Sequence, residues 1–233
     1  SRDSISATTA VVVDYVSMKA GIGIGGGRIR SAGEAVRNGA TVSTGKIPFW
    51  RLFQSAVKSC SQGAIRPGSA TMHYVFWDYE IEDLLVLKNN KGTQDNRLLQ
   101  MDYSVQFNKV MLERLVNGQD ITLFSPNAVP GMYDAYFNDV DLFRELYEKA
   151  ERNPKIRKKT ISAMELFSQF MTERKETGRV YFQFVDHCND HGSFIKELAT
   201  IYMSNLCQEI TLPTSPLNNA KDREGEVALC TLS

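Results

Sequence analysis

The sequence predicts an α/β protein built around a largely parallel sheet. Short apolar runs typical of buried strands alternate with longer segments whose apolar residues recur at helical spacing. The chain has 233 residues, of which 42% are hydrophobic, so it can bury one large core. Repeated alternation of strands and helices is typical of a parallel sheet or barrel covered by helices.

The first third of the chain contains two predicted helices, each followed by a glycine-bearing loop. Apolar residues at helical spacing predict a helix over 7–20 and a second helix over 47–59. Glycines then interrupt the apolar pattern in both places. We therefore expect flexible loops over 21–30 and 60–68.

Strands and helices alternate after residue 70. Extended apolar runs predict strands over 70–77, 103–107 and 180–185, and a last strand toward residue 233 that carries Cys230. Helical spacing and capping residues predict helices over 80–88 and 108–117, a helix capped by Asn138, and a helix from Ser162 to the residue before Gly178. The polar interval 148–160 is expected to be a solvated helix end and loop.

Composition excludes several classes of protein. The 27 Lys and Arg residues balance 27 Asp and Glu residues, so net charge gives no reason to expect membrane or nucleic-acid binding. No stretch approaches the roughly 20 apolar residues that cross a bilayer. Four scattered cysteines do not form the framework of a secreted disulfide-rich domain. We expect a cytoplasmic protein that binds neither membranes nor nucleic acid.

Both ends of the sequence lack the features of natural termini. Residue 1 is Ser, and the apolar, strand-like run 226–233 stops without a turn signal. A natural terminus is more often polar and frayed. The sequence is therefore expected to be an internal piece of a longer chain.

Glycines and arginines lie close together in the early loops. Residues 21–26 fit Gly-x-Gly-x-x-Gly, but a helix is predicted before them, where a dinucleotide site needs a strand. Phosphate binding by backbone amides and guanidinium groups remains open, and ordinary solvated loops are the alternative. The arginines concerned are Arg28, Arg30, Arg37 and Arg66.

A second polar cluster follows the predicted strand at 180–185. His187, Cys188 and His191 include types that bind zinc. The chain has only three His, however, and no further ligand group has recognisable spacing. We therefore expect a turn stabilised by Asp and Asn side chains, and no metal site.

The segment 204–210 has the most informative local pattern. If it is extended, alternate residues point the same way, so Asn205, Cys207 and Glu209 present an amide, a thiol and a carboxylate to one cavity. A reactive thiol beside a base and an orienting amide fits this order. Alternatively, Cys207 is a small buried apolar residue on a strand, and Cys230 is buried on the last strand in the same way.

Ten short blocks occur in the order that is typical of one enzyme family. They include Ala-Gly-Ile-Gly-Ile at 20–24, Ser-Asn-Leu-Cys at 204–207 and Ala-Leu-Cys-Thr-Leu-Ser at 228–233, and the others lie at 3–5, 27–30, 56–63, 84–90, 101–103, 120–126 and 185–189. Through them the chain resembles, along essentially all its length, the large catalytic subunit of class I (aerobic) ribonucleoside-diphosphate reductases.

The resemblance implies a fold and a reaction. Residues 1–233 would form part of a ten-stranded α/β barrel with a central finger loop, without the N-terminal regulatory region and the C-terminal half of the barrel. The reaction would be radical-based reduction of ribonucleoside diphosphates to deoxyribonucleoside diphosphates. Cys207 would carry a transient thiyl radical that removes the 3′ hydrogen of the ribose. Glu209 would take the 3′-hydroxyl proton, and Asn205 would hydrogen-bond the ribose. Cys230 would form a redox disulfide with a cysteine upstream of residue 1.

The early loops also gain a role from the resemblance. They would hold an allosteric effector, a deoxynucleoside triphosphate or ATP, that selects the substrate. The expected effector contacts are Ser1, Arg2, Arg30 and Arg37. Gln62 and Arg66 would lie in the loop that relays the identity of the effector to the substrate base.

The resemblance further implies partners. These are a small, metal-containing beta subunit that generates the radical, a second copy of the large subunit, and thioredoxin or glutaredoxin as reductant. No cofactor or metal is expected in this chain itself. Two alternatives remain: a nucleotide-binding regulatory module without catalysis, and a relative that uses adenosylcobalamin.

Overall fold

A five-stranded sheet forms the centre of the structure, a computed structural model that describes residues 1–62, 66–228 and 230–231. In spatial order the strands are β10 (Val180–Phe184), β7 (Asp102–Phe107), β6 (Ala70–Val75), β1 (Ala20–Gly25) and β11 (Cys230–Thr231). The first four are parallel to one another, and β11 is antiparallel to β1. The predicted α/β class with a largely parallel sheet is therefore confirmed.

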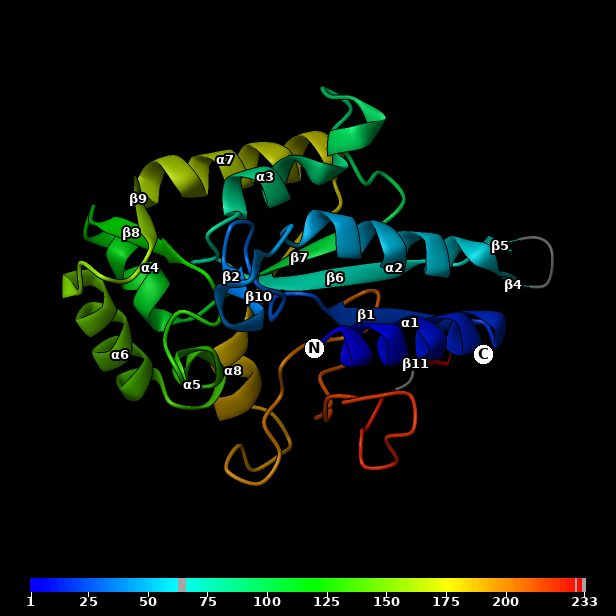
Figure 1. Cartoon of the computed structure of the whole chain (residues 1–233). Coiled ribbons are helices and arrows are strands. Elements are labelled where there is room, and N and C mark those ends of the chain that lie inside the picture. Colours follow the sequence, from blue (N-terminus) through cyan, green and yellow to red (C-terminus); the bar gives the residue numbers. More distant parts are fainter. Residues whose placement is uncertain (63–65, 229, 232–233) are drawn as a thin grey trace.

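Helices and the C-terminal segment cover opposite faces of this sheet. Figure 1 shows α2 (Ile47–Ser59), α3 (Ile81–Leu85) and α7 (Ala163–Thr177) on one side, and the orange and red segment after residue 200 on the other. Helix α1 (Arg2–Ser17) packs against α2 and β1. The C-terminal segment thus lies against the face that the helices leave uncovered.

The remaining elements extend the fold beyond one end of the sheet. Strands β8 (Asp120–Phe124) and β9 (Lys158–Ser162) form an antiparallel pair, and a bridge from Asp78 to Phe124 joins β8 to the chain after β6. Helices α4 (Lys109–Val116), α5 (Met132–Asn138), α6 (Val140–Arg152) and α8 (Val185–Asp190) complete this region. Within the described residues, no helix is long and apolar enough to cross a membrane.

Strand β6 explains why the two faces of the sheet differ. Its residues alternate between apolar and polar types, and all are buried. Tyr74 packs on Trp50 of α2, with ring centroids 5.3 Å apart, so the even-numbered residues face the helices. Thr71 and His73 point to the other face. The sheet therefore has one apolar face and one polar face, and both are covered.

Several predicted elements are confirmed. Helix α2 has the predicted bounds, and the side chain of Asn108 caps α4 by accepting a hydrogen bond from the Met111 amide at 3.3 Å. Ser162 caps α7, and Gly178 ends that helix in a left-handed conformation with φ of 65°. The predicted strands at 70–77, 103–107 and 180–185 correspond to β6, β7 and β10.

The flexible loop predicted over 21–30 is wrong in its first half. The first helix starts at Arg2 and ends at Ser17, and Ala20–Gly25 forms the strand β1. The glycines of β1 predict a loop because glycine has low strand propensity. Here tertiary packing outweighs that propensity and makes the segment a strand. The loop predicted over 60–68 contains two short strands, β4 (Ser61–Gln62) and β5 (Arg66–Pro67).

Three smaller predictions also need correction. The turn predicted at 186–191 is mostly the helix α8, in which the Asn189 side chain donates to the carbonyl of Val185 at 2.8 Å. The polar interval 148–160 ends in β9, which pairs with β8. Asp139, not Asn138, caps α6, because its side chain accepts from the Leu142 amide at 3.0 Å.

Candidate active site

The polar face of the sheet holds a segment without helix or strand, residues 202–210. Gln106 on β7 donates to the carbonyl of Tyr202 at 2.7 Å, and Thr71 on β6 donates to the carbonyl of Leu206 at 2.5 Å. Gln208 in turn donates to the carbonyl of Phe182 on β10 at 2.9 Å. Side chains of two strands and a backbone carbonyl of a third therefore hold the 202–210 segment along the sheet.

Glycines on β1 allow this close approach. Gly21, Gly23 and Gly25 alternate with isoleucines, and their bare face meets the 202–210 segment. A Cβ atom on Gly23 would lie 1.7 Å from the carbonyl oxygen of Ser204, far inside van der Waals contact. The alternation of Gly and Ile in the sequence is the signal that could have predicted this strand.

The predicted catalytic residues lie around a bend in the 202–210 segment. The chain bends over 206–208, and Gln208 has a left-handed φ of 69°. The Asn205 amide donates to Glu209 Oε1 at 2.8 Å, and Asn205 Oδ1 accepts from the Ile210 amide at 3.1 Å. The expectation of an extended segment over 204–210 is therefore wrong. The backbone bends at 206–208, and this bend brings Asn205 and Glu209 into direct contact.

Cys207 lies between these two residues in the sequence, at the bend. Its side chain is exposed, so the alternative of a small buried apolar residue is wrong. Although the side chain is exposed, partial desolvation of the sulfur, then the Glu209 carboxylate and the Cys230 thiol, raise the pKa of Cys207 above its ordinary value. The thiol thus stays protonated around neutral pH.

Cys230 approaches the same cluster from the last strand. It is 4% exposed, and its backbone pairs with Gly21 of β1. Its Sγ lies 3.9 Å from Glu209 Oε1. The structure therefore brings Asn205, Cys207, Glu209 and Cys230 together, although residue 230 follows the bend by more than twenty positions. All four cysteines of the described residues are free thiols.

His73 is a residue of this region that the sequence analysis did not identify. It is fully buried on β6, and neither ring nitrogen has a hydrogen-bond partner in good geometry among the described residues. Burial lowers the pKa of His73 to about 4, although Gln183 and the backbone of Asn205 and Ser204 partly offset this shift. The imidazole is therefore neutral beneath the 202–210 segment.

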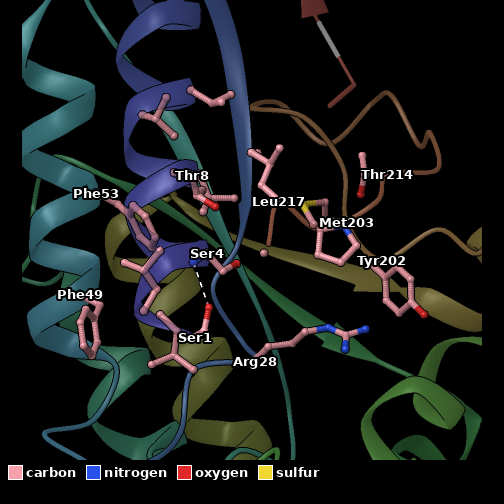
Figure 2. A pocket seen from close by; sticks show the side chains of 18 of the residues that line it. Ser1, Ser4, Thr8, Arg28, Phe49, Phe53, Tyr202, Met203, Thr214 and Leu217 are labelled. Atoms are coloured by element: carbon pink, nitrogen blue, oxygen red, sulfur yellow. Dashed lines mark hydrogen bonds between the residues drawn. The ribbon is translucent and has the colours of Figure 1, made fainter. Parts of the chain in front are cut away.

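A cavity of about 790 Å³ borders residues 202–205 and Ile210 of this segment. Figure 2 shows Ser1, which caps α1, and Ser4 and Thr8 of α1 on one side of it, and Tyr202, Met203, Thr214 and Leu217 on the other. The four residues predicted to bind an effector all line it, namely Ser1, Arg2, Arg30 and Arg37. Ser204 and Asn205 line it as well, whereas Cys207 and Glu209 do not. The cavity thus extends from the predicted effector residues to the predicted catalytic segment.

The two residues predicted to relay the effector signal lie on β4 and β5. The backbone of Gln62 pairs with that of Arg66 in an antiparallel register. Residues 63–65, between them, lie outside the described residues. The expected role of Gln62 and Arg66 stays a prediction.

The zinc interpretation of 186–191 finds no ligand cluster. His187 lies in α8 and His191 follows its last residue, and their ring centroids are 5.6 Å apart. In the part of the chain that the structure describes, no group of three or more His, Cys, Asp or Glu side chains is arranged to hold a metal ion. Residues 186–191 instead belong to the packing of α8, where Asp186 accepts from the Lys109 amide at 2.7 Å.

Comparison with known proteins gives one consistent result. The family model for the barrel domain of ribonucleotide reductase matches residues 1–233. The chain is 56% identical to ribonucleoside-diphosphate reductase subunit alpha of Haemophilus influenzae. The aligned region covers 100% of this chain and 31% of that protein.

Two further relatives show the range of similarity. Subunit alpha of ribonucleoside-diphosphate reductase 1 of Escherichia coli is 56% identical over 94% of this chain and 29% of its own length. The large subunit of Arabidopsis thaliana is 33% identical over 90% of this chain and 25% of its own length. The chain thus spans about a third or less of each of these relatives.

Proposed function

Because this chain belongs to the ribonucleotide reductase family, whose barrel domain it matches over residues 1–233, we propose that it is the catalytic part of a class I large subunit. In the complete protein it would reduce ribonucleoside diphosphates to deoxyribonucleoside diphosphates for DNA synthesis. The observation that carries this proposal is the cluster around the bend at 206–208. There a thiol, a carboxylate and an amide adjoin a second thiol on a neighbouring strand.

The roles proposed for these residues follow from their chemistry. Cys207, as a thiyl radical, takes the hydrogen atom from C3′ of the ribose and becomes a thiol. Glu209 accepts the proton of the 3′-hydroxyl, and Asn205 orients both the carboxylate and the sugar. The hydrogen bond at 2.8 Å between Asn205 and Glu209 supports this assignment, because it fixes the carboxylate beside the bend. The raised pKa of Cys207 supports it too, since a hydrogen atom is exchanged by a thiol and not by a thiolate.

Cys230 is proposed to supply reducing equivalents. With its partner cysteine, which in the family precedes residue 1, it gives two electrons and two protons. The 2′-hydroxyl then leaves as water, the two sulfurs form a disulfide, and Cys207 returns its hydrogen atom to C3′. One nucleoside diphosphate and two thiols thus become one deoxynucleoside diphosphate, one water and one disulfide. The position of Cys230 beside Glu209 supports this role.

The cavity beside α1 is proposed to bind the allosteric effector. Guanidinium groups suit phosphate oxygens, and Arg2, Arg30 and Arg37 all line this cavity. The effector would be a deoxynucleoside triphosphate or ATP, and the strands on either side of 63–65 would pass its identity to the substrate through Gln62 and Arg66. Coupling of this kind is a difference in binding free energy between two states.

Partners complete the proposed enzyme. The radical would come from a small beta subunit that carries the metal, and the large subunit would form a homodimer. Thioredoxin or glutaredoxin would reduce the disulfide after each turnover. We place this assembly in the cytoplasm, where such reductants keep cysteines as free thiols.

The experiment that tests this proposal is a turnover assay of the complete large subunit with its beta subunit. Cys207→Ser should abolish formation of deoxynucleotide from a nucleoside diphosphate, and it should leave the dissociation constants of substrate and effector within about twofold, because serine is nearly isosteric. Cys188→Ser, in helix α8, is the matched control and should turn over normally. Deoxynucleotide formation by Cys207→Ser would refute the proposed role. Inactivity of the wild-type holoenzyme, with intact nucleotide binding, would support a regulatory module instead.

A further inference from the structure

Arg28 connects the loop after β1 to the 202–210 segment, which is distant in the sequence. It follows β1, and its guanidinium carbon lies 4.8 Å from the ring centroid of Tyr133 and 4.9 Å from that of Tyr202. Tyr133 belongs to α5, and Tyr202 begins the 202–210 segment. Figure 2 shows the Arg28 side chain extending across the floor of the cavity toward Tyr202. The guanidinium group is therefore held by two aromatic rings from different elements.

The carboxylate of Asp134 bonds both Arg28 and Tyr202. Oδ1 of Asp134 accepts a short hydrogen bond from Arg28 and a hydrogen bond at 3.0 Å from the hydroxyl of Tyr202. Burial and the Asp134 carboxylate raise the pKa of Tyr202, so its hydroxyl stays a donor. Arg28, Asp134 and Tyr202 thus form a closed set in which each member contacts the other two.

This triad lies between the proposed effector site and the segment that carries Cys207. Arg28 precedes Arg30, one of the proposed effector contacts, by two residues, and both line the cavity. Tyr202 precedes Cys207 by five residues, and its carbonyl is held by Gln106. A displacement of the loop after β1 would therefore move the segment that carries Cys207, because the Arg28 side chain contacts both.

We propose that Arg28 is a positioning residue that couples the effector loop to the 202–210 segment through Asp134 and Tyr202. This inference rests on the proposed function, because it assumes an effector in the cavity. It names a contact between the two loops that does not pass through Gln62 and Arg66. Effector binding would fix the loop after β1, keep Arg28 between the tyrosines, and so reduce the motion of the segment that carries Cys207.

The chain offers a matched control at a distance from the site. The guanidinium carbon of Arg114 lies 4.7 Å from the ring centroid of Tyr147, and its Nη1 lies 2.6 Å from Glu151 Oε1. These residues belong to α4 and α6. Arg114 thus has the same chemistry of ring and carboxylate, but it contacts neither loop through these groups.

Hydrogen exchange of the backbone amides in 202–210 tests the proposal in the complete large subunit. The probe is dTTP at saturation, and its binding is measured separately by calorimetry. In the wild type, dTTP should slow this exchange about fivefold or more, the lower end of usual coupling energies. Arg28→Gln should remove the protection while dTTP still binds. Tyr202→Phe, which keeps the ring and loses the hydroxyl, should reduce it, and Arg114→Gln should leave it unchanged.

Each outcome separates this inference from the proposed function. Full protection in Arg28→Gln, or an equal loss in Arg114→Gln, would overturn the coupling role of Arg28. Absence of protection in a wild type that binds dTTP would overturn it as well. A wild type that binds no dTTP would refute the effector site itself, and the inference would fall with it. Arg28→Lys should restore only part of the protection, because lysine keeps the charge but not the planar group.

Discussion

The side-chain amide of Asn205 donates to the carboxylate of Glu209 across 2.8 Å, although the two residues are four apart in the chain. The bend at 206–208 makes this contact possible, and Cys207 lies at that bend. Asn205 also accepts from the amide of Ile210, so its side chain spans both arms of the bend. A single amide thus holds the bend closed and orients the proposed base.

A change of Asn205 to aspartate should place a second carboxylate beside Glu209. Like charges at this distance raise the pKa of one member of the pair. We expect the acid limb of the pH–rate profile of Asn205→Asp to move up by about one unit or more, and the rate at neutral pH to fall about tenfold or more. Asn205→Ala should lower the rate without moving the limb in the same way. An unshifted limb in Asn205→Asp would contradict the proposed contact.

Removal of the Glu209 charge should lower the pKa of Cys207. Partial desolvation is the largest cause of the raised pKa and Glu209 is the second, so Glu209→Gln removes part of the rise in the pKa of Cys207. Alkylation by iodoacetamide, followed by mass spectrometry of the peptide that carries Cys207, measures the thiolate fraction against pH. The midpoint should move to lower pH in Glu209→Gln. The midpoint of Cys60 in the same samples is the control, and an unchanged midpoint at Cys207 would contradict the electrostatic account.

A methyl group on Gly23 should displace the 202–210 segment. The Cβ atom would lie 1.7 Å from the Ser204 carbonyl oxygen, which is backbone and cannot rotate away. We expect Gly23→Ala to lower kcat/KM about a hundredfold, the usual effect of a displacement of about 1 Å near a reacting centre. Gly21→Ala is the matched control on the same strand, because its Cβ would lie 3.1 Å from a side-chain atom of Leu206. Equal activity of the two variants would contradict this explanation of the glycines.

The buried imidazole of His73 should make stability depend on pH. Burial lowers the pKa of His73 from 6.5 to about 4 in the folded state. Between these values the unfolded chain binds a proton that the folded chain does not, so stability should fall as the pH decreases from about 6.5 to about 4. The loss is on the order of 3 kcal/mol. Above pH 6.5 this contribution is constant.

Chemical unfolding of the wild type and of His73→Phe across this range measures the effect of His73. Carboxylates also titrate in this range, and the difference between the two proteins isolates the histidine. The phenylalanine variant should lose less stability on acidification, and it should be at least as stable at neutral pH, because the unpaired ring nitrogens are gone. Parallel pH curves for the two proteins would show that His73 is not buried as the structure has it.

Local sequence signals predicted those elements that local interactions control. Helix α2 has the expected bounds because its apolar stripe and its early proline act within the helix. Ser162 was recognisable as a cap, because its side chain bonds an amide three residues ahead. In the same way, the polar order Asn-x-Cys-x-Glu pointed to the proposed catalytic group.

Contacts between distant segments decided the rest. The glycines of β1 predict a loop when only neighbouring residues are considered, because the reason for them is the backbone of 202–210, about 180 residues later. The contact between Asn205 and Glu209 could not be predicted from an extended spacing, since it depends on a left-handed residue, Gln208, that is not glycine. In the sequence Arg28 resembles the other loop arginines, because only the fold brings Tyr133 and Tyr202 to its guanidinium group.

The central claim is that Cys207 removes hydrogen from C3′ of the ribose. The measurement that tests it most directly compares kcat/KM for a nucleoside diphosphate with protium and with deuterium at C3′, in the complete large subunit with its beta subunit. If this bond is cleaved, kcat/KM with protium divided by kcat/KM with deuterium should exceed one in the wild type. Cys207→Ser should form no deoxynucleotide from either substrate. Deoxynucleotide formation by Cys207→Ser, or a ratio of one in the wild type, would contradict the account.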